Sequence, residues 1–175
     1  MAITISQAEP NDARGMQEVF YKTWLATYPN KDIGVTVEDI EDRFKDVFTE
    51  EQLEKKREQL RNPKEGVTTL LAKDGDTIVG LSIVLVAENN KLQALYVLPE
   101  FQGKGIGSQL WHEAQKAFDI TKDTIVEVAT YNTKAIRFYE TLGFVDTGEK
   151  WLDEKFIMKS GTQIPEMRMI LKKKI

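Results

Sequence analysis

The segment 101–108, FQGKGIGS in one-letter code, constrains the fold and the function more than any other part of the chain. Glycine tolerates positive φ angles and carries no Cβ, so glycines at alternate positions let backbone N–H groups turn into one concavity. Downstream, Ile106, Leu110 and Ala114 recur at helical spacing, which indicates a helix that begins at this loop and runs to about Phe118. The unpaired N–H groups and the dipole of a helix N-terminus favour phosphate. The segment therefore predicts a diphosphate-binding loop.

Two common phosphate motifs do not fit this loop. A P-loop requires G-x-x-x-x-G-K-[ST], and no glycine here precedes a Lys-Ser or Lys-Thr pair in that way. A dinucleotide fingerprint requires G-x-G-x-x-G, but Ser108 falls where reading from Gly103 demands the third glycine. What remains is Gln102-x-x-Gly105-x-Gly107, which resembles the Q/R-x-x-G-x-G/A pyrophosphate loop of the GNAT superfamily of N-acetyltransferases. A glycine-rich turn that only caps a helix is the alternative interpretation.

A second segment resembles the other signature of the same superfamily. Residues 132–144, NTKAIRFYETLGF, match N-x-x-A-x-x-[FL]-Y-x-x-x-G-F in sequence and in their distance from the glycine loop. With both motifs in the right order, the chain is identified as a member of the GNAT superfamily. The resemblance is best over residues 67–145.

The resemblance implies that the chain uses acetyl-coenzyme A as its cosubstrate. The superfamily binds this molecule by the glycine loop, by unpaired backbone groups of the strand before it, and by the asparagine and tyrosine of the second motif. The residues implied are Leu95, Tyr96, Val97, Gln102, Gly103, Lys104, Gly105, Ile106, Gly107, Ser108, Asn132 and Tyr139. Leu95 and Val97 can equally be plain core residues.

Length and composition fit a single soluble domain. The 175 residues are 41% hydrophobic and 30% charged, so we expect one domain that spans residues 1–175. No apolar run approaches the length of a membrane span, and residues 1–4 lack the basic and apolar regions of a signal peptide. We therefore expect a cytoplasmic protein without a membrane partner.

The residue inventory excludes several chemistries. The sequence has no cysteine, which excludes disulfides, thiolate metal sites and a cysteinyl enzyme intermediate. Its single histidine, His112, is expected at the surface or in packing, so we expect no metal site. The 28 acidic residues exceed the 24 basic ones, which argues against nucleic-acid binding and favours a cationic substrate.

The apolar periodicity predicts the order of helices and strands. Strands are expected near residues 3–5, 67–73, 77–86, 91–98, 124–130, 145–149 and 166–172, with residues 151–163 as a strand end and a long loop. Three helices are expected before the second strand, because three sets of capping residues lie there: Asn11 or Asp12, Thr36 with Asp39, and Thr49 with Gln52. Two further helices follow the glycine loop and Asn132.

The resemblance implies an α/β (mixed α+β) GNAT fold. Its element order is β-α-α-β-β-β-α-β-α-β-β, with a mixed, mostly antiparallel central sheet flanked by helices. In this fold the strands at 91–98 and 124–130 are neighbours that splay apart, which frees backbone groups of Leu95 to Val97 for the pantetheine amides.

Acetyl transfer to an amine needs a proton acceptor for the amine and a proton donor for the departing thiolate. By its place in the second motif, Tyr139 corresponds to the tyrosine that protonates the thiolate in many relatives. Segment 126–128, Val-Glu-Val, resembles the strand of relatives that acetylate protein N-termini, where the glutamate is the proton acceptor, so Glu127 is the predicted base. Alternation along the strand also allows Glu127 to face solvent, and a water chain or a backbone carbonyl can serve instead.

The acceptor is less constrained by the sequence. In the family the first helices and the loop between the last strands wall its site, which here means Trp24, Tyr28, Phe44 and residues 151–163. Segment 49–53 resembles polyamine acetyltransferases related to the PaiA type, whereas Glu127 and its neighbours indicate N-terminal protein acetylation. A small amine, a polyamine, an antibiotic and a peptide N-terminus stay open, as does a homodimer. A non-catalytic acyl-coenzyme A sensor with the same fold is the alternative function.

Overall fold

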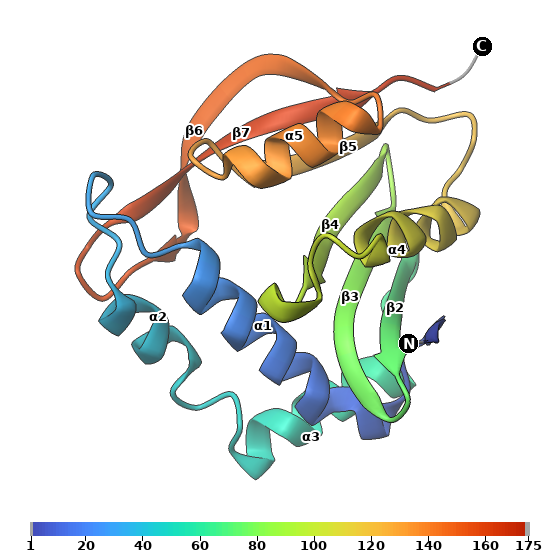
Figure 1. The fold of residues 1–175 in the computed structure, drawn as a ribbon, viewed down its shortest axis with the longest axis horizontal. Helices are drawn as coiled ribbons and strands as arrows, with labels where there is room; N and C mark the ends of the chain where they lie inside the picture. The colour runs from blue at the N-terminus through green and yellow to red at the C-terminus, as the bar shows by residue number, and fades with distance from the viewer. Residues whose placement is uncertain (1, 174–175) are drawn as a thin grey trace.

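The computed structural model describes residues 2–173, which form one seven-stranded sheet with the strand order β1-β2-β3-β4-β5-β7-β6 (Figure 1). The β4–β5 pair is parallel, and the other neighbouring strands are antiparallel. The strands are β1 (Ile3–Gln7), β2 (Val67–Asp74), β3 (Thr77–Val86), β4 (Asn90–Val97), β5 (Thr124–Ala129), β6 (Val145–Ile157) and β7 (Gln163–Leu171). The predicted mixed, mostly antiparallel sheet is confirmed.

Five α-helices flank this sheet in the described part of the chain: α1 (Ala13–Thr27), α2 (Val37–Phe44), α3 (Glu50–Arg61), α4 (Ile106–Ala114) and α5 (Thr133–Thr141). Three of them precede β2, one more than the family pattern has, and the third is the helix that Thr49 predicts. Thr36 and Asp39 form a capping box at the start of α2. Of the capping box expected at α3, one hydrogen bond is present: the Thr49 hydroxyl accepts from the Gln52 N–H at 3.4 Å.

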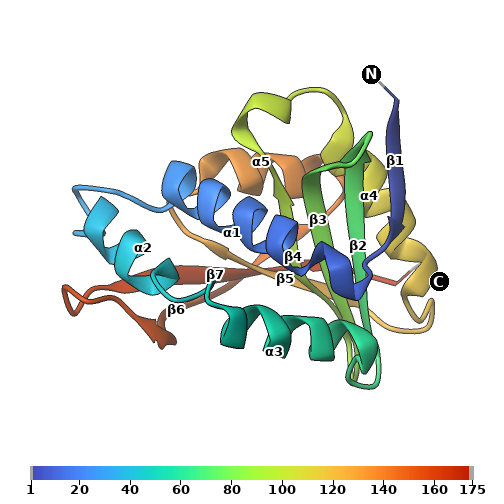
Figure 2. The same cartoon turned by 90° about the horizontal axis from the view of Figure 1, so that it is seen from below.

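The helices cover opposite faces of the sheet, as consecutive residues of β5 show. Val128 belongs to a buried cluster with Trp111 of α4 and Tyr139 of α5, whereas Ala129 belongs to one with Trp24 of α1 and Ile40 of α2. Because successive strand residues point to opposite faces, α1 and α2 lie on one face of this part of the sheet and α4 and α5 on the other. Figure 2 shows α1 running across the sheet, where it contacts β3 and β4.

The prediction that residues 151–163 form a strand end and a long loop is wrong, because most of them belong to the last β-hairpin. Strand β6 continues to Ile157, and β7 already begins at Gln163, so only residues 158–162 form the connection. Met158 N donates to Thr162 O at 2.8 Å and closes this turn. β6 is an edge strand with mostly exposed side chains, and two irregularities interrupt its pairing with β7. An edge strand of this kind has no alternation of apolar and polar residues from which it could be recognised.

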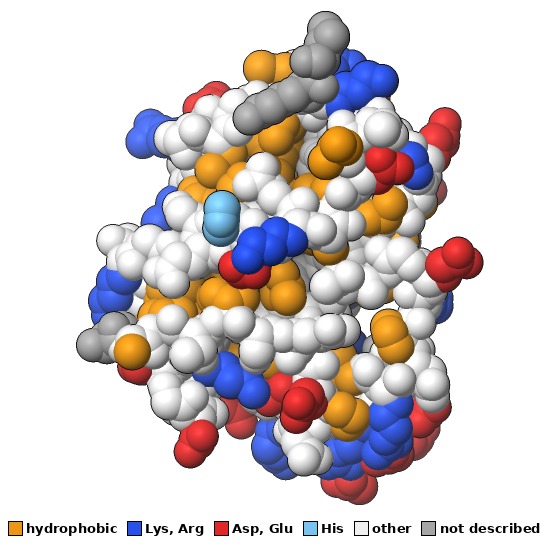
Figure 3. All heavy atoms as spheres, turned by 90° about the vertical axis from the view of Figure 1, so that its right-hand side faces the viewer, with side chains coloured by type: hydrophobic (Ala, Val, Ile, Leu, Met, Phe, Trp, Pro, Cys, Tyr) orange, Lys and Arg blue, Asp and Glu red, His pale blue; other side chains and the backbone are white. Residues whose placement is uncertain are grey.

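The surface carries charges of both signs. Figure 3 shows one face on which Lys and Arg side chains are interspersed with Asp and Glu, among scattered hydrophobic groups. On α3 such charges form ion pairs, for example Lys55 with Glu51 at 2.7 Å. No helix within residues 2–173 combines the length and the apolar character that crossing a membrane requires.

Candidate active site

The centre of the sheet opens where β4 and β5 part. Their parallel pairing is limited to residues 90–92 of β4 and 124–126 of β5. On the other side of β4, Val84 pairs with Leu92 and Ile83 with Ala94, so Gln93 is an extra residue that forms a β-bulge. A bulge bends its strand and re-aims the side chains that follow. The expected splay of these strands is therefore present, and it begins at Gln93.

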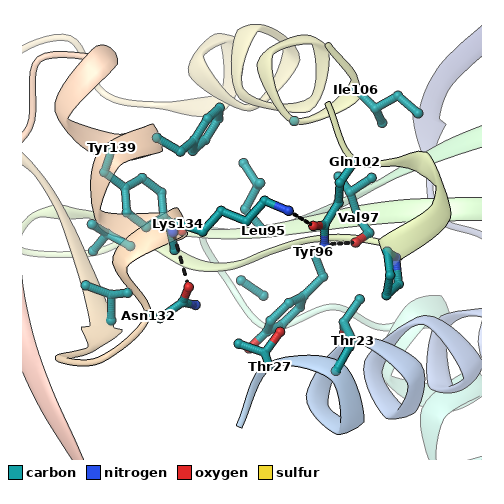
Figure 4. Close-up of a pocket in the computed structure, with 18 of the residues that line it drawn as sticks. Thr23, Thr27, Leu95, Tyr96, Val97, Gln102, Ile106, Asn132, Lys134 and Tyr139 are labelled. Carbon is teal, nitrogen blue, oxygen red and sulfur yellow. Dashed lines mark hydrogen bonds between the residues drawn. The ribbon is translucent and has the colours of Figure 1, made fainter. Parts of the chain in front are cut away.

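The splay leads into a cavity of about 730 Å³. Its lining includes every predicted cofactor-binding and catalytic residue except Lys104: segment 95–97, Gln102, Gly103, segment 105–108, Glu127, Asn132 and Tyr139. Of the residues predicted around the acceptor, it includes Tyr28 but not Trp24, Phe44 or segment 151–163. The ammonium group of the exposed Lys104 instead lies 4.8 Å from the centre of the Phe101 ring. Helix α1 contributes Thr23 and Thr27, which point toward the cavity beside Tyr96 (Figure 4).

Two glycines shape the loop at one end of the cavity. Gly103 and Gly105 have φ angles of 75° and 78°, in the left-handed region, and a Cβ built on either residue meets no atom within 4 Å. Gly105 is the N-cap of α4, so the first N–H groups of that helix lack intrahelical partners beside this open space. The space that a side chain would fill and the free donors suit a diphosphate.

Gly107 has a different role in the same loop. A Cβ on Gly107 would lie 3.4 Å from Cζ of Phe138 on α5 and 3.6 Å from Cδ2 of Leu95 on β4. The absence of a side chain at this position therefore lets α4 approach α5 and β4 closely. This glycine serves packing as well as lining the cavity.

Gln102 and Lys134 bridge the cavity mouth, as the dashed lines in Figure 4 show. The Gln102 amide nitrogen donates to Val97 O at 2.9 Å, and Lys134 Nζ donates to the Gln102 amide oxygen at 2.5 Å. Lys134 thus brings a positive charge to the glycine loop, although it lies 32 residues further along the chain. The sequence prediction missed Lys134, whose only signal was a lysine in the first turn after Asn132.

Asn132 and Tyr139 lie at the two ends of α5. The Asn132 side chain accepts from Ala135 N at 3.2 Å, so it caps the helix as well as lining the cavity. Tyr139 is 6% exposed, and within residues 2–173 its hydroxyl has no hydrogen-bond partner. Burial, reinforced by Tyr96, raises the pKa of Tyr139 well above its ordinary value. The hydroxyl therefore keeps its proton and can donate it toward the cavity.

Glu127 lines the cavity but is held by two cations. Its carboxylate accepts from Lys91 Nζ at 2.5 Å and from Arg168 at 3.3 Å. Burial disfavours the ionised form, but the hydrogen bonds and charges of Lys91 and Arg168 outweigh it and lower the pKa of Glu127 below its ordinary range. A carboxylate with a lowered pKa is a weak proton acceptor.

Aromatic side chains pack between α1, α2 and the face of the sheet that these helices cover. Trp24 packs against Tyr28 and Phe44, with ring centroids 4.3 Å and 5.8 Å apart. The Arg43 guanidinium lies 4.4 Å from the centre of the Trp24 ring and 3.7 Å from that of Phe156 on β6. The elements expected around the acceptor thus meet here: α1, α2 and the β6–β7 hairpin. Tyr28 also lines the cavity.

Several solved structures share this architecture. The PaiA N-acetyltransferase from Thermoplasma acidophilum, in complex with coenzyme A, aligns with a TM-score of 0.76 and 22% identity over 98% of this chain and 99% of that chain. The ribosomal-protein-S18-alanine N-acetyltransferase from Escherichia coli aligns with a TM-score of 0.66 and 17% identity over 99% and 96% of the two chains. At these identities the likeness shows a common fold.

Sequence comparisons give the family. The peptidyl-lysine N-acetyltransferase YjaB of Salmonella typhimurium is 32% identical over 81 residues, which are 46% of this chain and 52% of that protein. The match therefore spans about half the length of this curated relative. Residues 24–159 match the model of the acetyltransferase (GNAT) domain. Because this match covers most of the chain, the protein belongs to the GNAT acetyltransferase family.

Proposed function

We propose that this protein transfers the acetyl group of acetyl-coenzyme A to a primary amine, directly and within a ternary complex. The observation that carries the proposal is the continuous cavity that joins the glycine loop, the splayed segment of β4 and Tyr139. One end offers free N–H groups and Lys134 for a diphosphate, and the other offers a buried hydroxyl for a leaving thiolate.

The residues have separate roles in this proposal. Segment 103–108 and Lys134 bind the diphosphate, and the backbone of segment 95–97, which does not pair with β5, hydrogen-bonds the pantetheine amides. Tyr139 gives its proton to the thiolate as the C–S bond breaks. Direct transfer is favoured because the sequence has no cysteine to carry an acyl intermediate.

The acceptor enters from the face of α1 and α2. A cationic amine suits the acidic surplus of the chain, 28 acidic against 24 basic residues, and the aromatic rings of Trp24 and Tyr28. Glu127 is the proton acceptor that the sequence predicts, but its ion pairs with Lys91 and Arg168 weaken it as a base. The reaction therefore needs a stronger proton acceptor than Glu127.

Release of free thiol from acetyl-coenzyme A, measured against a panel of amines, tests the proposal. The panel contains spermidine, a peptide with one internal lysine and a peptide with a free N-terminal alanine, each with its acetylated form as the control. We expect amine-dependent thiol release with at least one acceptor. Calorimetric binding of acetyl-coenzyme A without turnover of any amine would instead support a sensor.

A further inference from the structure

Glu166 on β7 faces the same side of the sheet as the proposed acceptor site. It lies opposite Ala129 of β5 and Trp151 of β6 in the strand register. Ile164, two residues earlier, packs in the buried cluster of Trp24 and Ile40. Because alternate residues of a strand share a face, the Glu166 side chain also extends toward α1 and α2.

The Glu166 carboxylate differs from its neighbour Glu127. Within residues 2–173 no side chain forms a hydrogen bond or an ion pair with Glu166, although the residue is only partly exposed to solvent. Glu127, by contrast, forms ion pairs with both Lys91 and Arg168. A half-buried carboxylate without a partner has its acceptor sites free for a ligand.

The charged and titratable groups on the face that Glu166 shares come from every neighbouring element. They are Tyr28 of α1, Arg43 of α2, Lys91 and Tyr96 of β4, Glu127 of β5, Asp153 and Lys155 of β6, and Arg168 of β7. Burial, with Asp153 and Glu127, raises the pKa of Glu166 to about 7 against the opposing effect of Lys91 and Lys155. A carboxylate of this kind can gain and lose a proton at neutral pH.

Glu166 does not itself line the cavity, but two tyrosines that do, Tyr28 and Tyr96, pack against the buried cluster on the face that Glu166 shares. The hydroxyls of Tyr28 and Tyr96 lie 3.4 Å apart, and both residues line the cavity. Burial, with further contributions from Tyr96, Glu166 and Tyr139, raises the pKa of Tyr28, so its hydroxyl keeps its proton at neutral pH. The site therefore combines aromatic rings with an unpaired carboxylate, a combination that binds ammonium groups.

We propose that Glu166 binds the ammonium group of the acceptor and takes its proton. The inference rests on the acetyl transfer proposed above and identifies the base for it. The ammonium gives one proton to the Glu166 carboxylate, and the free amine nitrogen attacks the thioester carbonyl. The C–N bond forms and the C–S bond breaks. Tyr139 donates its proton to the sulfur and is restored by the second N–H proton of the former ammonium. Glu166 later releases its proton to water.

The first test compares Glu166→Gln with Glu127→Gln and with Glu154→Gln, a matched control at an exposed position on β6. With an amine that the wild type acetylates, Glu166→Gln should lower kcat/KM by about 10²-fold at neutral pH. The defect should shrink as the pH approaches the pKa of the amine, about 10 for a lysine-like group, because free amine then forms without a base. Glu127→Gln removes a charge that raises the pKa of Glu166, so it should move the pH profile to lower pH without the loss of about 10²-fold, and Glu154→Gln should match the wild type in rate and in pH dependence.

Calorimetry with acetyl-coenzyme A separates this role from a structural one, since Glu166→Gln should leave the Kd within about twofold. If Glu166→Gln stays within about threefold of the wild type, or loses the same factor at every pH, Glu166 is not the base while the proposed function stands. If the wild type acetylates no amine, the proposed function itself fails.

A second test needs no acceptor. A ¹³C NMR titration of the glutamate carboxyls, assigned with the Glu→Gln variants, should give Glu166 a midpoint of about 7 and Glu127 one below its ordinary range. A Glu166 midpoint at the ordinary glutamate value of about 4.3 would overturn the inference.

Discussion

Lys134 Nζ, in the first turn of α5, donates a hydrogen bond to the amide oxygen of Gln102, in the loop that leads to α4. The same Gln102 side chain donates to Val97 O at 2.9 Å. One glutamine thus links the last residue of β4 with a cation on α5. The charge of Lys134 is thereby held beside the glycine loop, where the proposed diphosphate binds.

Lys134→Met should weaken binding of coenzyme A. The substitution removes the charge but keeps most of the apolar stem, and a charge-assisted hydrogen bond contributes about 1.5–3 kcal/mol. We expect a Kd about tenfold higher by calorimetry, with a smaller effect at high salt because exposed charges are screened. Lys116→Met, at an exposed lysine beyond the end of α4, is the control. Equal affinities of the two variants would show that Lys134 does not contact the diphosphate.

Gly105→Ala should abolish or strongly reduce cofactor binding. Gly105 has a φ of 78°, and its Cβ would project into open space beside the cavity. Gly75, in the β2–β3 hairpin, has a φ of 59° and equally open surroundings, so Gly75→Ala is a matched control. Both variants should lose about 1–2 kcal/mol of stability through left-handed strain. Only Gly105→Ala should lose affinity in calorimetry, and unchanged binding would remove Gly105 from the cofactor site.

The features that the sequence predicts well are local ones. Gly105 and the caps Thr36 and Thr49 act on residues within one or two turns, so their spacing alone indicates a loop or a helix start. The two family motifs then order the elements. The boundaries of β6 could not be predicted because its exposed side chains follow no period.

The parts of the candidate site that the sequence missed depend on tertiary pairing. The bulge at Gln93 is defined by its partners Ile83 and Val84 on β3. Glu166 and Glu127 differ in charge environment because β4 places Lys91, and β7 places Arg168, within ion-pair distance of Glu127. No spacing along the chain distinguishes a carboxylate that forms two ion pairs from one that forms none.

Asp39→Asn should destabilise the fold in a pH-dependent way. Asp39 Oδ1 accepts from Ser160 N at 2.7 Å and Oδ2 from Thr36 N at 2.9 Å, so one buried carboxylate joins α2 to the β6–β7 turn. Burial opposes ionisation, but the N–H groups of Thr36 and Ser160 prevail and lower the pKa of Asp39 below its ordinary value. The ionised form therefore stabilises the fold above about pH 3.9, and this contribution is lost as the pH falls through the folded-state pKa.

Urea unfolding at two pH values checks this. At neutral pH, Asp39→Asn should cost about 1–3 kcal/mol, the usual effect of leaving buried donors without their acceptor. Near pH 3 the difference from the wild type should become smaller. Asp42→Asn, in the same helix, removes an ion pair with Lys45 and should change stability by less than about 1 kcal/mol. A pH-independent difference for Asp39→Asn would mean that the charge of Asp39 does not matter.

Tyr139→Phe tests the proposed proton donor. The ring packs edge-on against Phe138 and Phe144, with both centroid distances at 5.6 Å, and phenylalanine keeps these contacts. Stability and the Kd of acetyl-coenzyme A should therefore change little. If the hydroxyl protonates the leaving thiolate, it acts mainly in the transition state, so kcat and kcat/KM should fall together. Because a thiolate whose thiol has a pKa near about 8.5 leaves readily, we expect a loss of about 10², the lower end for general-acid catalysis.

The pH profile and a control variant complete this test. Since burial and Tyr96 raise the pKa of Tyr139 above its ordinary value, the hydroxyl stays protonated throughout the neutral range. The factor lost in Tyr139→Phe should therefore be the same at every pH in that range, unlike the loss expected for Glu166→Gln. Tyr21→Phe, where the ring packs against Phe44 at 5.6 Å, should leave the rate unchanged. A drop of less than about threefold in a folded Tyr139→Phe would make Tyr139 a packing residue, and proton delivery to sulfur would then fall to water.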